Sequence, residues 1–229
     1  MVTDEEMAKR LMRKLSRYGV KDGPTTVEVG EALHSLGAIA RDLKDSRPLQ
    51  EAEGIITYVI DKHNDVPTPP EVLEGAVKGA AALGTERAGL ALNRLVQTTT
   101  PDYVACEALK GISKTIPKSS SDGREKMVAG LQRALKHPSG SVRALAAEYL
   151  GEHGEKEHAI HLATLSLHAP EEHVRNSAKN ALAELAKRHG ISKRDARNSL
   201  QKALGTRPSP SLVKRQEETM SFVERQIRD

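Results

Sequence analysis

The chain has 229 residues, of which only 2% are aromatic, and its single cysteine, Cys106, excludes an intrachain disulfide. Abundant Ala, Leu, Glu, Lys and Arg predict an all-α protein, because β-sheets favour the aromatic and β-branched residues that are scarce here. The charge is uneven: residues 1–115 carry 15 Lys/Arg and 17 Asp/Glu, whereas residues 116–229 carry 20 and 14. A basic C-terminal half suits nucleic acid or an acidic protein partner, and it is equally typical of an ordinary solvated surface.

The first residues include acidic side chains and lack the apolar core of a secretory signal. The chain also has no run of about 18 apolar residues. We therefore expect a soluble, cytoplasmic protein without a membrane partner.

Three helices are expected first, near residues 3–18, 25–44 and 48–63. They form an N-terminal region, residues 1–65, that is either a degenerate repeat or a helical cap.

A helical stripe then recurs along the chain. Each copy begins with valine and continues with a small or apolar residue four and eight positions later, so that the three share one helix face. A proline precedes each full copy, and the starting valines are 32, 38 and 32 residues apart. The full copies are Val72–Ala76–Ala80, Val104–Ala108–Ile112, Val142–Ala146–Leu150 and Val174–Ala178–Leu182, and a weaker copy is Val29–Leu33–Gly37.

Partner helices are expected near residues 85–97, 122–136 and 155–167, which gives a helix–turn–helix unit over residues 66–190. Thr68 and Glu71 have the spacing of a capping box, and Thr100 and Ser139 are predicted N-caps. A helix near 191–204, the linker 205–211 and a helix near 211–228 make a C-terminal cap, residues 191–229. One continuous solenoid domain is predicted, since a single helix pair cannot bury its own apolar stripe.

Two segments, "HPSGSVRALAAEYLGEHG" and "APEEHVRNSAKNALAELA", resemble the second helix of HEAT-like repeats. The resemblance implies a right-handed α-solenoid of about five HEAT-like helix pairs with capping helices. It also implies that the valine-arginine helices line the concave face and that their arginines are structural. His137 and Ala169 stand where the family usually has aspartate before proline. The matching positions are Val142, Arg143, Ala146, Leu150 and Gly151, then Val174, Arg175, Ala178 and Leu182, with Val104 beginning a fair match earlier.

Enzymes of similar repeat style are not favoured by these residues. Deoxyhypusine hydroxylase uses His-Glu dyads as iron ligands, and this chain has no His-Glu pair. DNA glycosylases depend on aromatic stacking, for which five scattered aromatic residues are a poor basis. Cys106, in a helical stretch, is expected to be a buried structural thiol. We therefore expect no catalysis, no cofactor and no small-molecule substrate.

Five of the nine histidines lie between Glu152 and His173. His158 and His161 share a face of a predicted helix, with His153 in the preceding turn and His173 in the following one. These residues could hold zinc, but no second Cys/His pair is present to close a structural site, so no metal is predicted.

A long exposed face remains the main functional feature, and a non-enzymatic scaffold or adaptor that binds a protein partner along the concave face is expected. The alternative is a nucleic-acid or ribosome-associated binder that uses the basic C-terminal half, including Lys193, Arg194 and Arg197. Glu74, Glu107, Glu148 and Glu184 share the same helix faces as the candidate binding residues. Those candidates are Lys78, Lys110, Lys114, Asn176, Lys179, Asn180 and Lys187.

Overall fold

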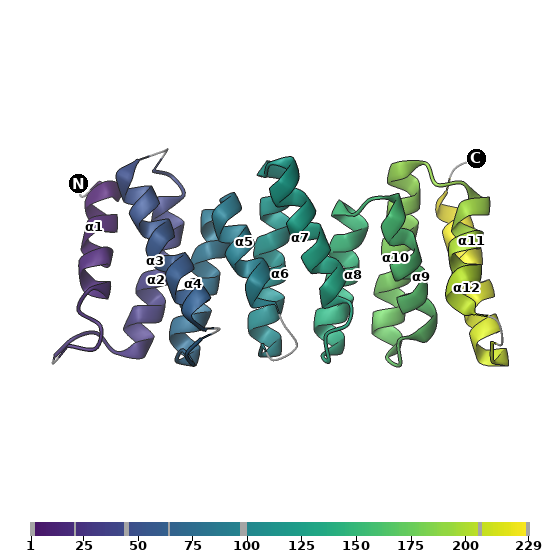
Figure 1. Cartoon of the computed structure of the whole chain (residues 1–229), viewed down its shortest axis with the longest axis horizontal. Helices are drawn as coiled ribbons and strands as arrows, with labels where there is room; N and C mark the ends of the chain where they lie inside the picture. The colour runs from purple at the N-terminus through teal and green to yellow at the C-terminus, as the bar shows by residue number, and fades with distance from the viewer. Residues whose placement is uncertain are drawn as a thin grey trace. The chain divides into compact units, whose positions relative to one another are not determined.

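The computed structural model describes residues 3–20, 22–43, 46–63, 65–96, 100–205 and 208–227. All regular secondary structure in these ranges is helical, and no strand is present in them, which confirms the all-α fold class (Figure 1). The α-helices are α1 (Asp4–Leu15), α2 (Thr26–Ala40), α3 (Arg47–His63), α4 (Pro70–Leu83), α5 (Glu86–Leu95), α6 (Asp102–Thr115), α7 (Ser121–Ala134), α8 (Gly140–His153), α9 (Ala159–His168), α10 (Glu172–His189), α11 (Lys193–Leu204) and α12 (Pro210–Gln226).

Each predicted helix is present, with ends shifted by a few residues. Two short 3₁₀ helices, η1 (Ile116–Lys118) and η2 (Lys156–His158), follow α6 and precede α9. His153 is the last residue of α8 and His173 the second residue of α10, so the predicted turn positions of both are wrong. Thr206 and Arg207 of the predicted linker lie outside the described residues.

The chain divides into two compact units, residues 1–127 and 128–229, with the boundary inside α7. In the first unit α4 packs between α2 and α6, α3 and α5 pack on each other and on this layer, and α1 covers α2 and α3. In the second unit α10 packs between α8 and α12, while α9 packs on α10 and α11. The domain boundaries predicted near residues 65 and 190 stay predictions.

The repeated stripes lie in the cores of the two units. Their starting residues, Val72, Val104, Val142 and Val174, are at most 3% exposed, and the small residues four positions on are fully buried. Small side chains at these places let neighbouring helices approach closely, so an interior poor in aromatic residues is still well filled. The weaker stripe is buried as well, since Val29, Leu33 and Gly37 of α2 all face the core.

Helices α2 and α4 meet at glycines. A Cβ atom added to Gly37 would lie 2.1 Å from the carbonyl oxygen of Gly79, and one added to Gly75 would lie 2.1 Å from the carbonyl oxygen of Gly30. No side chain fits at such distances, so the two backbones are in direct contact over two helical turns. This glycine crossing fixes α2 onto the first full repeat helix.

The helix N-termini differ from the predictions. Pro69 and Pro101 occupy the N-cap positions of α4 and α6, and neither helix has a side-chain cap, so Thr68 and Thr100 are not caps. Ser139 stands at the N-cap of α8, but its hydroxyl makes no capping hydrogen bond. Capping boxes are instead formed by Thr3 with Glu6 at α1 and by Thr25 with Glu28 at α2. Among the described helices, none is long and apolar enough to cross a membrane.

Candidate binding surfaces

The two arginines of the valine-arginine helices bind the repeat itself. The Arg143 guanidinium donates to the carbonyl oxygens of His137 and Pro138, at 2.6 and 2.7 Å, and to both carboxylate oxygens of Glu171, each at 2.6 Å. Arg175 donates in the same way to the carbonyls of Ala169 and Pro170. Both side chains therefore hold the turn before their own helix, and Arg143 also joins α8 to the start of α10.

Electrostatics at this contact favour the ion pair. The Arg143 hydrogen bonds lower the pKa of the Glu171 carboxyl, and the Arg143 side chain is only 12% exposed. His137, where the family usually has aspartate, is buried, and its Nδ1 accepts a hydrogen bond from the Ser139 amide at 3.1 Å. An imidazole acceptor thus serves the turn in place of a carboxylate.

Two of the three predicted lysines of the first unit, Lys78 and Lys110, are paired with acidic residues one turn away. The Lys78 ammonium lies 2.6 Å from a Glu74 carboxylate oxygen, and Lys110 lies 2.6 Å from Glu107. These hydrogen bonds raise the pKa of both lysines, so each remains charged but is locally neutralised. Lys114 is exposed one turn beyond Lys110. This helix face therefore carries alternating charge.

In the second unit, α10 presents a mixed polar face. Asn176, Asn180, Glu184 and Lys187 are exposed at helical spacing along it. Lys179 lies half-buried, with its ammonium 5.0 Å from the ring centre of Phe222 in α12. Lys179 thus contributes to packing between helices, in a cation–π contact, as well as to surface charge.

Three basic residues of α11 differ in their contacts and in their exposure. Arg197 forms an ion pair with Glu224 of α12, which ties the last two helices together. Arg194 is exposed, and Lys193 is half-buried.

The histidines of residues 153–161 do not converge. His158 Nδ1 accepts a hydrogen bond from the Glu155 amide, and His161 Nε2 lies 2.8 Å from the Gln132 side-chain amide. The rings of His158 and His161 are 6.5 Å apart, and burial lowers the pKa of His161. Across the described part of the chain, no three His, Cys, Asp or Glu side chains are arranged to hold a metal.

Cys106 is half-buried in α6 rather than fully buried. Burial raises the pKa of its thiol, so the nucleophilic thiolate is scarce at neutral pH.

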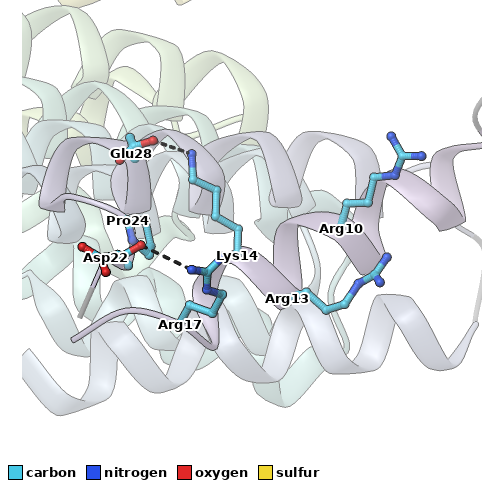
Figure 2. A pocket seen from close by; sticks show the side chains of 8 residues that line it. Arg10, Arg13, Lys14, Arg17, Asp22, Pro24 and Glu28 are labelled. Carbon is cyan, nitrogen blue, oxygen red and sulfur yellow. Dashed lines mark hydrogen bonds and ion pairs between the residues drawn. The ribbon is translucent and has the colours of Figure 1, made fainter. Parts of the chain in front are cut away.

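A basic groove at the N-terminal end of the first unit was not predicted. It has a volume of about 710 Å³ and lies between α1 and the start of α2. Figure 2 shows Lys14 directed to Glu28 and Arg17 to Asp22, while Arg10 and Arg13 extend away from both acidic residues. Lys14 lies 3.1 Å from Glu28, and Arg17 donates to the Asp22 carbonyl at 3.3 Å.

An apolar groove of about 380 Å³ adjoins the other side of α1. Tyr18, Tyr58 and Val66 line it and are 42%, 62% and 62% exposed. The sequence held a signal for the basic side, because Arg10, Arg13 and Arg17 recur at one-face helical spacing. It held none for the apolar groove, whose walls come from α1, α2, α3, α4 and the residues between α3 and α4.

Comparison with known proteins agrees with this architecture. A family model described as HEAT repeats matches residues 103–183. A solved structure titled as the crystal structure of an engineered protein is similar over 95% of this chain and 97% of its own, with 18% identity and a TM-score of 0.53. No curated protein matches the chain.

Two further solved structures match with low TM-scores and carry no weight for the fold. One, titled as a computational design of self-assembling cyclic homooligomers, has 18% identity and a TM-score of 0.23, over 98% of this chain and 79% of its own. The other, titled as a de novo designed 16-helix transmembrane nanopore, has 15% identity and a TM-score of 0.20, over 97% of this chain and 63% of its own. The family match over residues 103–183 and the all-helical fold together identify HEAT-like repeats in a chain whose fold class is an all-α solenoid.

Proposed function

We propose that the protein is a non-enzymatic binding scaffold that engages a protein partner along the faces of its repeat helices α4, α6, α8 and α10, the faces expected to be concave. The observation that carries the proposal is the charge pattern on α4 and α6. Lys78 and Lys110 are each held by a glutamate of the same helix. A surface of alternating charge complements the mixed charge of another protein, whereas a phosphate backbone calls for lysines free of carboxylates.

Two further observations support a protein partner. Tyr103 of α6 and Val27 of α2 are 48% and 52% exposed at positions in line with the charged residues of their helices. Apolar side chains among polar ones are typical of protein interfaces. The arginines that could have clamped phosphates, Arg143 and Arg175, are instead bound to backbone carbonyls within the repeats.

Affinity purification of the tagged chain from native cells, with and without nuclease, tests the proposal. We expect a protein that co-purifies in both samples and that is reduced by Lys110→Glu and by Lys114→Glu. Lys126→Glu is the matched control, because Lys126 is an exposed lysine of α7, outside these faces, that pairs with Asp122.

The same purification, compared with and without nuclease, would also show that the proposal is wrong. Loss of every co-purifying protein on nuclease treatment would indicate a nucleic-acid-mediated assembly. Binding to a generic duplex or to ribosomal RNA would then fall steeply with salt, because each phosphate contact releases counterions. It would also weaken for Lys110→Glu, Lys114→Glu and Lys179→Glu.

A further inference from the structure

Helix α1 separates two grooves of opposite character. Lys14 and Arg17 line the basic groove, whereas their sequence neighbours Leu15 and Tyr18 line the apolar one. On α2, Glu28 lines the basic groove and the next residue, Val29, lines the apolar groove. Only the width of a helix therefore divides a cationic surface from an apolar surface.

The apolar groove is unusually exposed for this protein. The chain has four tyrosines, and two of them, Tyr18 and Tyr58, stand at this groove with large exposed fractions. Val66, from the segment after α3, is 62% exposed beside them. Tyrosine is one of the residue types enriched among the side chains that dominate binding energy in protein interfaces. The groove therefore exposes an apolar surface that a binding partner would cover.

The basic groove is lined by residues with a net positive charge. Four cationic side chains, Arg10, Arg13, Lys14 and Arg17, line it together with two acidic residues, Asp22 and Glu28. Lys14 is engaged by Glu28, and the Arg17 guanidinium by the Asp22 backbone. Arg13 donates through Nε to the Lys9 carbonyl at 3.4 Å, and Arg10 and Arg13, both exposed, extend away from Asp22 and Glu28 (Figure 2). Arg10 and Arg13 thus present positive charge at the surface.

We propose that these two grooves together form a docking site for an acidic amphipathic segment of a partner protein. Its apolar side chains would enter the groove at Tyr18 and Tyr58, and its carboxylates would meet Arg10 and Arg13. Charge complementarity selects an acidic partner, and the neighbouring apolar groove selects a peptide over a phosphate backbone, which would use only the basic side. The inference rests on the proposed protein-binding function and assigns it a second surface with a partner chemistry.

A synthetic peptide tests the inference with the full chain. The probe is a fluorescent amphipathic helix of about four turns with leucine on one face and glutamate on the rest. We expect saturable binding by fluorescence anisotropy that weakens at least about tenfold for Arg10→Glu/Arg13→Glu and for Tyr58→Ser. A peptide with glutamine in place of glutamate, and one with serine in place of leucine, should each bind more weakly.

The matched control is Lys110→Glu/Lys114→Glu, which makes the same charge change on α6. It should leave peptide binding unchanged while it reduces capture of the partner in the purification experiment. Circular dichroism should show native helix content in each variant, because the altered side chains are exposed. A second variant, Val66→Asp, probes the apolar groove independently of the tyrosine.

Three outcomes would overturn the inference. The first is equal binding of the glutamate and glutamine peptides, and the second is loss of binding in the α6 control alone. The third is self-association of the chain, removed by Tyr58→Ser, which would show that a second copy occupies the groove. The first and third results do not bear on whether a partner binds through α4 and α6, so the two proposals can fail separately.

Discussion

Arg143 joins the turn before α8 to the start of α10 through its side-chain hydrogen bonds. It satisfies two carbonyls of the turn before α8 and neutralises Glu171 at the start of α10. Arg143→Ala should lower the free energy of unfolding by about 2 kcal/mol, since charge-assisted hydrogen bonds of a nearly buried group are lost. Arg143→Lys should lie between, because an ammonium cannot reach all the acceptors together.

Urea denaturation followed by circular dichroism measures this effect. The control is Arg197→Ala, which removes an exposed ion pair with Glu224 and should cost less than about 1 kcal/mol. Equal effects of Arg143→Ala and Arg197→Ala would contradict a structural role for Arg143.

Glu28 makes the first unit sensitive to acid. The Thr25 amide, and then Lys14, lower the pKa of Glu28 from its ordinary 4.5 to about 2. Because the folded value lies below the unfolded one, its contribution to stability is present above pH 4.5 and is lost as the pH falls toward 2. The melting temperature of Glu28→Gln should therefore fall less than that of the wild type over this range. Calorimetry showing parallel losses would contradict the prediction.

At the scale of elements, the glycine crossing of α2 and α4 predicts how glycine substitutions change the stability of the fold. Gly37→Ala places a methyl group against the Gly79 backbone, which cannot yield as a side chain would, and should destabilise the fold by about 2 kcal/mol or more. Gly54→Ala in α3 is the matched control, because a Cβ there meets nothing within 4 Å. It should stabilise the protein by about 0.5–1 kcal/mol through helix propensity. Chemical denaturation of both variants provides the comparison, and similar values for the two would exclude a tight crossing.

The helices themselves were predictable because each carries a stripe with helical spacing. The valines and small residues from Val72 to Leu182 lie in the cores where the pattern places them. The caps were less predictable, because Pro69 and Pro101 take positions that Thr68 and Thr100 could also have filled. Sequence spacing shows which residues share a face, but it does not show which of two adjacent residues begins the helix.

The binding surfaces were predictable only in part. The binding role of Lys78 and Lys110 stays a prediction, and their pairing with Glu74 and Glu107 depends on rotamers that spacing does not determine. The apolar groove was missed because its walls lie up to 57 residues apart, from Leu15 to Val72, and no local pattern joins them.

On the scale of the whole molecule, burial is distributed unequally. Helix α1 buries one residue completely, Ala8, whereas α4 buries eight. In repeat proteins each element depends on its neighbours, so an element with few buried contacts opens more readily. Amide hydrogen exchange should therefore be faster in α1 than in α4, as measured by mass spectrometry of peptides from each helix. Equal protection of the two helices would contradict this ranking.

The glycine crossing also determines how α2 and α4 are aligned along their length. Gly30 and Gly37 are two turns apart, whereas Gly75 and Gly79 are one turn apart. If α4 slid by one turn in one direction, Gly37 would face Leu83. The Leu83 side chain would then have to occupy a space that holds only the Gly79 backbone. In the observed register Gly30 lies against the Glu71 backbone and Gly37 against Gly79. The glycines therefore act as a register mark that opposes this shift of α4 along α2.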